Sequence, residues 1–253
     1  MAELIAKKLS IASADKPLVH EADLQLRSGE LAVLLGPNGA GKTSLIRGLL
    51  GLASLSGGNV QLDGVDVGDL TATQRARSVS YLPQSRPMAW PNRVRDIVAL
   101  GRFSHGAALG RLKGRDAEAV DDALAACGLS TLADRRTNTL SGGELARVHC
   151  ARAFATQAAL LIADEPVAAV DPRHQFQILD LISAYVRQGG GALVVLHDLN
   201  LAARYATRLI WMKDSRIVAD GKPNETLTAS RIRSIYGVQA RVDGGGVTLN
   251  GTD

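Results

Sequence analysis

The 253 residues are enough for one large domain with a buried core or for two small domains. Hydrophobic residues make up 46% of the chain and charged residues 21%, which is ordinary for a soluble globular protein and, with no run of about 18 apolar residues, gives no membrane-spanning segment. The net charge of +4 comes from scattered basic residues, so charge alone does not select a partner.

The first third of the sequence predicts strands followed by a glycine loop and a helix. Residues 4–35 alternate between apolar and polar positions in short runs, and residues 31–35 are almost all apolar, which is typical of a buried parallel strand. Helical periodicity covers residues 43–52. Residues 60–67 predict a hairpin around the turn Asp63-Gly64.

The rest of the chain alternates helices and strands. Residues 92–158 have a mainly helical pattern, and two apolar strands at 160–163 and 192–196 flank a helix at about 174–188. We therefore predict an α/β core interrupted by a helical insertion. The glycine-rich residues 242–253 predict a peripheral tail.

Two further features bear on the cellular compartment. The first seven residues are not followed by a long apolar segment, so we expect no signal peptide. Cys127 and Cys150 have no metal-type spacing, and we expect two reduced, buried thiols, although the sequence alone leaves a disulfide open.

A phosphate-binding loop follows the predicted buried strand and matches G-x-x-x-x-G-K-[ST]. Glycines let backbone N–H groups point inward, and the start of the following helix adds its positive end. A lysine in this position reaches the β- and γ-phosphates, and the next hydroxyl can bind Mg²⁺. The alternative, a glycine-rich turn with a surface lysine, fits the strand before it and the helix after it less well. The predicted phosphate-binding residues are Gly36, Pro37, Asn38, Gly39, Ala40, Gly41, Lys42, Thr43 and Ser44.

Two acids end the apolar strand at 160–163. Asp164 has the position of a Mg²⁺-binding acid, and Glu165 that of a general base that polarises the attacking water. Two acids that merely begin a surface turn are the alternative, and the phosphate loop upstream makes it weaker.

A third motif opens the helix that contains residues 147–154. Ser141 with Glu144 three residues later predicts a capping box, and two glycines between them leave an exposed anion site at the helix N-terminus. Because one loop already binds the phosphates, this second site suggests contact with a nucleotide held by another subunit. The motif comprises Leu140, Ser141, Gly142, Gly143 and Glu144.

Taken together, the motifs resemble those of ABC transporter ATPases over nearly the whole chain. The resemblance implies a P-loop NTPase core, with a mainly parallel sheet and flanking helices, an antiparallel β subdomain and a helical subdomain. It implies ATP and Mg²⁺ as cofactors. In that family Gln84 senses Mg²⁺ and the permease, the segment 140–144 (the signature) contacts the γ-phosphate across a dimer, Asp171 in the D-loop links the two sites, and His197 steadies the γ-phosphate. Taken singly, Gln84 could be a polar loop residue and His197 a core histidine.

The resemblance also supplies roles and partners. The expected catalytic residues are Glu165, His197 and Gln84, and the expected Mg²⁺ ligands are Thr43, Gln84 and Asp164. Partners would be a second copy of the chain, integral membrane permease subunits and, indirectly, a substrate-binding protein, without nucleic acid. The chain would sit on the cytoplasmic face of the inner (plasma) membrane, bound through the permease.

Narrower matches favour importers of iron-siderophores, haem and cobalamin. They lie at Trp90-Pro91, at residues 94–102 and at residues 197–206. An ATPase of a zinc or manganese transporter, a soluble ABC ATPase that acts on nucleic acid or a cofactor, and a non-catalytic cassette are the alternatives. The expected division is a core with its β subdomain at 1–90 and 159–240, a helical subdomain at 91–158 and a tail at 241–253.

The sequence departs from the family pattern at four places. An aromatic residue that stacks on adenine is expected near Ser13, but the first aromatic residue of the chain is Tyr81, which predicts weak discrimination between bases. Residues 166–171 lack the common Thr-Ser pair. Glu144 replaces the commoner glutamine, and Leu145 stands where a long polar side chain is usual.

Overall fold

The chain folds into two units, each with its own strands and helices. The computed structural model describes residues 2–13, 16–84, 91–107, 110–168, 170–244 and 246–252, so Trp90 and Ala169 lie outside the described residues. The first unit contains residues 1–69 and 191–253, and the second contains residues 70–190. The division into core, helical subdomain and tail that the sequence suggests stays a prediction.

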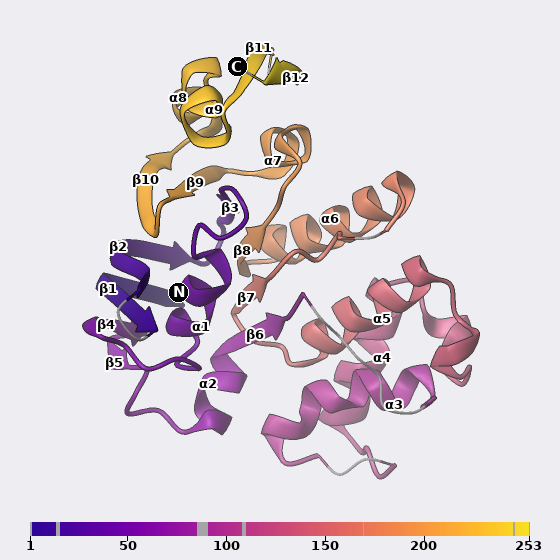
Figure 1. Cartoon of the computed structure of the whole chain (residues 1–253). Coiled ribbons are helices and arrows are strands. Elements are labelled where there is room, and N and C mark those ends of the chain that lie inside the picture. The colour runs from indigo at the N-terminus through magenta and orange to yellow at the C-terminus, as the bar shows by residue number, and fades with distance from the viewer. Residues whose placement is uncertain are drawn as a thin grey trace. The chain divides into compact units, whose positions relative to one another are not determined.

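Strands dominate the first unit, which combines both ends of the chain (Figure 1, indigo and yellow). Its strands are β1 (Glu3–Ser13), β2 (Lys16–Arg27), β3 (Leu31–Leu35), β4 (Gly57–Leu62), β5 (Val65–Asp66), β8 (Gly191–Val195), β9 (Arg208–Lys213), β10 (Arg216–Gly221), β11 (Val238–Asp243) and β12 (Gly246–Thr252). Its helices are α1 (Lys42–Leu49), α7 (Leu199–Tyr205), α8 (Pro223–Thr226) and α9 (Ala229–Tyr236).

One sheet of this unit is antiparallel, in the order β2-β1-β4-β5. It includes the predicted hairpin, with Leu62 opposite Val65. Asp63 and Gly64 both have positive φ (50° and 82°), the geometry of the tight turn that matches strand twist. The hairpin prediction and the antiparallel β part of the fold prediction are confirmed.

A second set of strands is mainly parallel and forms the most buried part of the unit. β3 pairs in parallel with both β8 and β9, while β10 is antiparallel to β9. All five residues of β3 and all five of β8 are buried, as expected for strands covered on both faces. Hydrophobic burial of this kind is the main force that stabilises the fold.

Helix α1 ends earlier than the periodicity predicts, at Leu49 instead of Leu52. Gly51 has φ +64°, and the amide of Leu52 donates to the carbonyl of Arg47, which is a Schellman ending. The glycine therefore stops the helix although the apolar pattern continues.

At the C-terminus the sequence predicted only a tail, but the structure shows an antiparallel hairpin of β11 and β12. The side chain of Asn200 in α7 binds it at both backbone groups of Val247: Nδ2 donates to the carbonyl (3.0 Å), and Oδ1 accepts from the amide (2.7 Å). Asn200 thus binds both backbone groups of Val247 as a second neighbouring strand would, while Val247 also lies opposite Val242 in the hairpin.

The second unit is mainly helical (Figure 1, magenta and pink). It contains α2 (Ala72–Ser78), β6 (Val79–Leu82), α3 (Val94–Ala99), the short helices η1 (Leu100–His105), η2 (Ser130–Leu132) and η3 (Thr137–Thr139), α4 (Arg115–Ala126), α5 (Gly142–Ala155), β7 (Leu160–Ala163) and α6 (Pro172–Arg187). β6 and β7 pair in parallel. These elements confirm the helical part of the predicted fold.

Buried polar contacts hold the helices of this unit together. Arg102 of η1 is 5% exposed; its Nε donates to Asp116 of α4 (2.8 Å) and its Nη1 to the carbonyl of Ala155 at the end of α5 (2.9 Å). A buried guanidinium is stable only when its donors are satisfied. Cys127 and Cys150 are both buried and are not joined by a disulfide, and burial together with the neighbouring Cys150 raises the pKa of Cys127.

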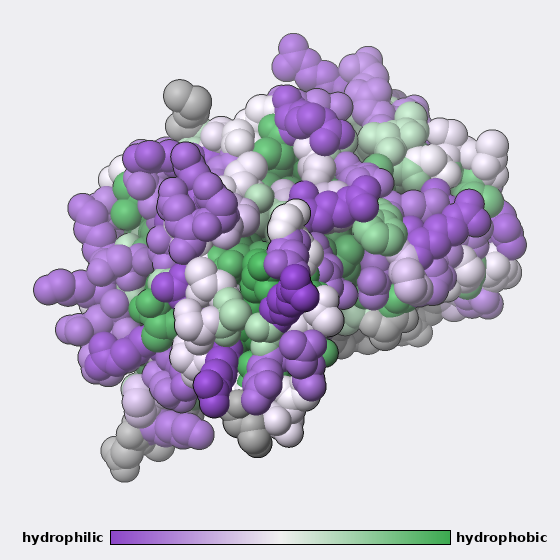
Figure 2. Space-filling view, turned by 90° about the horizontal axis from the view of Figure 1, so that it is seen from above, coloured by the Kyte–Doolittle hydropathy of each residue, from purple (hydrophilic) through white to green (hydrophobic). Residues whose placement is uncertain are grey.

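Polar residues cover much of the face drawn in Figure 2, with small hydrophobic areas between them. Within the described residues, no helix is both long and apolar enough to cross a membrane. The large hydrophobic side chain with the greatest exposure among those described is Phe103, at 76%.

Candidate functional site

Strand register in the first unit brings the phosphate-binding loop and His197 to the same edge of the parallel sheet. Leu34 of β3 lies opposite Val195 of β8. Gly36 comes two residues after Leu34, and His197 comes two residues after Val195. The amide of Leu196 continues the pairing by donating to the carbonyl of Leu34. The carboxyl edge of a parallel sheet is where α/β proteins bind ligands.

Two glycines of the loop are required by close backbone approaches. A Cβ on Gly36 would lie 2.3 Å from the carbonyl oxygen of Met212, and a Cβ on Gly41 would lie 2.1 Å from that of Leu18. Gly41 also has φ +99°. The loop can therefore lie against β9 and β2 only because both side chains are absent.

Lys42 begins α1 and is 7% exposed. Its ammonium donates to the carbonyls of Gly36 (2.7 Å) and Pro37 (2.9 Å), so the side chain spans its own loop. Thr43 and Ser44 follow in the first turn, where α1 has no side-chain cap. Uncapped amides at a helix N-terminus, beside a lysine, form an anion-binding site.

Sequence reasoning missed Tyr236, which lies near the start of this loop. The phenol lies at the end of α9, and burial raises its pKa to about 12. The nearby backbone of Gly36 has a smaller effect, which lowers the pKa. Tyr236 thus lies beside the residue at which the loop begins. Its place in an apolar helix stripe with Ile232 and Ile235 indicated only a core position.

Gln84, Asp164 and Glu165 gather at the equivalent edge of β6 and β7 in the second unit. Leu82 pairs with Ala163, and the amide of Asp164 donates to the carbonyl of Leu82. Gln84 and Glu165 come two residues after Leu82 and Ala163, and Gln84 Nε2 donates to Glu165 Oε2 over 2.7 Å. The predicted base and the predicted sensor are therefore in direct contact.

The two acids differ sharply in their surroundings. Asp164 is 1% exposed, whereas Glu165 is half-buried and has φ +50°. A non-glycine residue in the left-handed region costs on the order of 1 kcal/mol or more, and such strain is common at functional sites. The strained backbone sets the direction in which the Glu165 side chain starts from the end of the strand.

The predicted capping box at the start of α5 is confirmed. Ser141 Oγ accepts from the amide of Glu144 (3.2 Å), and Glu144 Oε2 accepts from the amide of Ser141 (2.8 Å). The hydrogen bond from the Ser141 backbone lowers the pKa of Glu144, so this carboxylate stays ionised. Leu140 precedes the cap, and Ser141 and Gly142 are exposed while Gly143 is buried.

Asp171 caps α6 and lies within the same unit. Its Oδ1 accepts from the amide of His174 (3.1 Å) and its Oδ2 contacts Nδ1 of the same residue (2.6 Å). The side-chain hydrogen bond with His174 is the main cause of the lowered pKa of Asp171. His174 was not singled out from the sequence.

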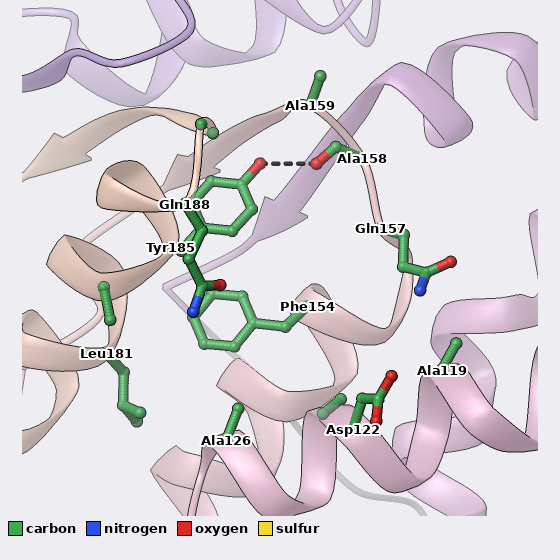
Figure 3. Close-up of a pocket in the computed structure, with 14 residues that line it drawn as sticks. Ala119, Asp122, Ala126, Phe154, Gln157, Ala158, Ala159, Leu181, Tyr185 and Gln188 are labelled. Carbon is green, nitrogen blue, oxygen red and sulfur yellow. Dashed lines mark hydrogen bonds between the residues drawn. The ribbon is translucent and has the colours of Figure 1, made fainter.

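A pocket of about 510 Å³ lies among α4, α5 and α6, and Figure 3 shows that its lining is unlike a phosphate site. Six alanines line it, and Phe154 stacks on Tyr185 with ring centroids 5.5 Å apart. None of the residues that line it was predicted as a site residue, and none is basic. This pocket therefore offers no positive charge to bind a triphosphate.

The predicted residues thus form three groups within the units. The phosphate loop and His197 form one group, in the first unit. The second unit contains the other two groups: Gln84 with Asp164 and Glu165, and the signature with Asp171. Among the described residues, no cluster of three or more His, Cys, Asp or Glu forms a metal site.

Comparisons with known proteins show which family and fold the chain resembles. The sequence pattern of the family described as "ABC transporter" matches residues 19–168. The chain is 39% identical over 239 residues to the hemin import ATP-binding protein HmuV of Pseudomonas entomophila (strain L48), with 92% of each chain covered. It is 35% identical over 243 residues to the ferric enterobactin transport ATP-binding protein FepC of Escherichia coli (strain K12), with 96% of this chain and 90% of the other covered. Its fold matches that of MJ1267, an ATP-binding cassette of an ABC transporter in its ADP conformation, with a TM-score of 0.84, 22% identity and coverage of 93% and 98%.

Proposed function

Because the chain belongs to the family of ABC transporter ATP-binding proteins, we propose that it energises an importer of iron chelates: ferric siderophores, haem or cobalamin. The observation that carries the proposal is its likeness, over nearly its full length, to proteins named for hemin import and ferric enterobactin transport. ATP hydrolysis coupled to transport is the family's activity, and the cargo is the proposed part.

ATP would be held through its phosphates. The loop 36–44 offers backbone amides, the α1 N-terminus and the Lys42 ammonium, and His197 lies at the same sheet edge. Thr43, Gln84 and Asp164 supply hard oxygen donors of the kind that Mg²⁺ prefers, and Asp164 is buried. When bound, the ion neutralises charge on the β- and γ-phosphates.

Hydrolysis would use Glu165 as the general base for the attacking water. The hydrogen bond from Gln84 orients the Glu165 carboxylate, and the strained backbone of Glu165 sets the direction in which the side chain starts. A shift of Gln84 therefore changes the surroundings of the base directly. This contact gives a route by which a partner that moves Gln84 would alter hydrolysis.

A second copy of the chain would complete each site. The capped N-terminus of α5, with exposed Ser141 and Gly142, is an anion site apart from the phosphate loop. In a symmetric dimer it would contact ATP held by the partner, and Asp171 would link the two sites. A permease would hold this dimer at the cytoplasmic face of the inner (plasma) membrane, and a substrate-binding protein would supply that permease with cargo.

Two exposed apolar residues of one short helix in the second unit support the permease contact. Phe103 is 76% exposed and Leu100, in the same helix η1, is 38% exposed. The chain is only 4% aromatic, so a phenylalanine in water is an unusual use of this residue type. Positions three apart lie on one face of such a helix, so Leu100 and Phe103 expose apolar surface together, and contiguous apolar surface marks interaction sites.

A pull-down from membranes of the source organism tests the proposal. We expect a tagged chain to recover a polytopic permease, and we expect Phe103→Ser to reduce that recovery at least fivefold without lowering the melting temperature. Leu249→Ser in β12, a residue 57% exposed, is the matched control and should leave recovery unchanged. A permease found beside genes for zinc or manganese uptake, or recovery of nucleic acid in place of a permease, contradicts the proposed cargo or the proposed partner respectively.

Binding of the adenine base of the nucleotide is expected to be weak. An aromatic platform contributes about 1–3 kcal/mol per base, and the sequence offers none before Tyr81. Equilibrium dissociation constants for ATP and GTP should therefore agree within about threefold when measured with the same chain by fluorescence or calorimetry. A preference for ATP of a hundredfold would contradict this expectation.

A further inference from the structure

Gly143 is buried in the first turn of α5 because the ring of His174 covers it. A Cβ on Gly143 would lie 2.0 Å from His174 Cδ2 and 2.3 Å from both Cγ and Nε2. The imidazole of α6 therefore lies directly against the signature backbone. Ser141 and Gly142 beside it remain exposed.

The same imidazole is held by Asp171. Its Nδ1 donates to Oδ2 of that carboxylate over 2.6 Å, while the His174 amide donates to Oδ1. An N-cap needs only one carboxylate oxygen, so the second one is available to orient the ring. A single side chain thus joins the D-loop aspartate to the signature glycine.

Neither helix requires this contact in order to form. The start of α5 already has a complete capping box from Ser141 and Glu144, and α6 has its cap from Asp171 and a proline in its first turn. The packing of His174 on Gly143 is therefore not needed for either helix to form. Its effect is to fix the position of the start of α5 relative to the start of α6.

We propose that His174 is a positioning residue that locks the signature to Asp171, so that both meet the partner chain's ATP as one rigid element. The inference rests on the proposed function, because it assumes that these two elements contact nucleotide across the dimer. His174 touches no nucleotide itself in this account.

The test separates binding within one chain from contact across the dimer. In a Glu165→Gln background, MgATP affinity is measured on dilute chain, and the dimer dissociation constant is measured by analytical ultracentrifugation at saturating MgATP. We expect His174→Ala to raise the dimer dissociation constant at least fivefold and to leave ATP affinity within twofold. His174→Gln retains a donor for Asp171 and His174→Phe retains a ring against Gly143, so each should recover part of the loss.

A steric pair tests the contact itself. Gly143→Ala should lower the melting temperature because its Cβ overlaps the imidazole, and adding His174→Ala should return it to that of His174→Ala alone. If His174→Ala changes the melting temperature but not the dimer dissociation constant, the residue is merely structural and the inference is wrong. If the Glu165→Gln chain stays monomeric in MgATP, this inference fails with the dimer that it assumes. If the chain binds no MgATP, the proposed function fails as well, whereas a dimer insensitive to His174 overturns this inference alone.

Discussion

Replacing Glu165 by glutamine is expected to slow ATP hydrolysis by roughly 10²- to 10⁴-fold while MgATP binding stays within about twofold of the wild type. The amide keeps the size and the strained backbone position of the side chain but cannot accept the proton of water. Steady-state phosphate release and equilibrium nucleotide binding, measured on one preparation, give the two quantities.

A matched control exists elsewhere in the chain. Glu21 is an exposed glutamate that also has a left-handed backbone (φ 46°, against 50° for Glu165), so Glu21→Gln repeats the chemistry and the strain away from the site. It should hydrolyse ATP at the native rate. If Glu165→Gln does the same, the base has been assigned to the wrong residue.

Replacing Lys42 by methionine is expected to weaken MgATP binding by about 30-fold or more, since loss of a buried, charged hydrogen-bonding partner costs about 2–5 kcal/mol. Methionine fills the volume of a side chain that is 7% exposed, so the loss reports the charge more than a cavity. Isothermal titration calorimetry with MgATP measures the change.

The fold of this variant needs its own check, because Lys42 also binds the carbonyls of Gly36 and Pro37. A melting curve measures that part. Lys7→Met, at an exposed position of β1, should leave both the melting temperature and the affinity unchanged. Native affinity in a folded Lys42→Met chain would mean that the triphosphate is held elsewhere.

Local rules of the sequence predict much of the fold. Unbroken apolar runs identified β3, β7 and β8, the Asp63-Gly64 turn identified the hairpin, and Ser141 with Glu144 identified the start of α5. Each of these signals lies within a few residues of the structure that it specifies. The early end of α1 at Gly51 and the C-terminal hairpin depend on a left-handed glycine and on the distant Asn200, which periodicity does not report.

Motifs also place most of the candidate site, whereas its supporting contacts come from tertiary structure. The spacing of acids and glycines along the chain is enough to indicate Lys42, Asp164 and Glu165. The hydrogen bond of Gln84 with Glu165, the approach of Tyr236 to Gly36 and the cover of Gly143 by His174 join residues on different elements. Such pairs carry no local pattern, so only the folded chain reveals them.

The central claim is that the phosphate loop of one chain and the signature of its partner share one ATP, and cysteine cross-linking tests it most directly. One chain carries Asn38→Cys and the other Ser141→Cys, both at exposed positions, while the native Cys127 and Cys150 are buried. The two variants are mixed, in membranes that contain the permease as well as in solution, and oxidised with or without MgATP. A disulfide requires Cα atoms within about 7 Å. We expect a covalent dimer from the mixture only when MgATP is present and none from either variant alone. No dimer under any condition, or the same yield without nucleotide, would contradict the shared site.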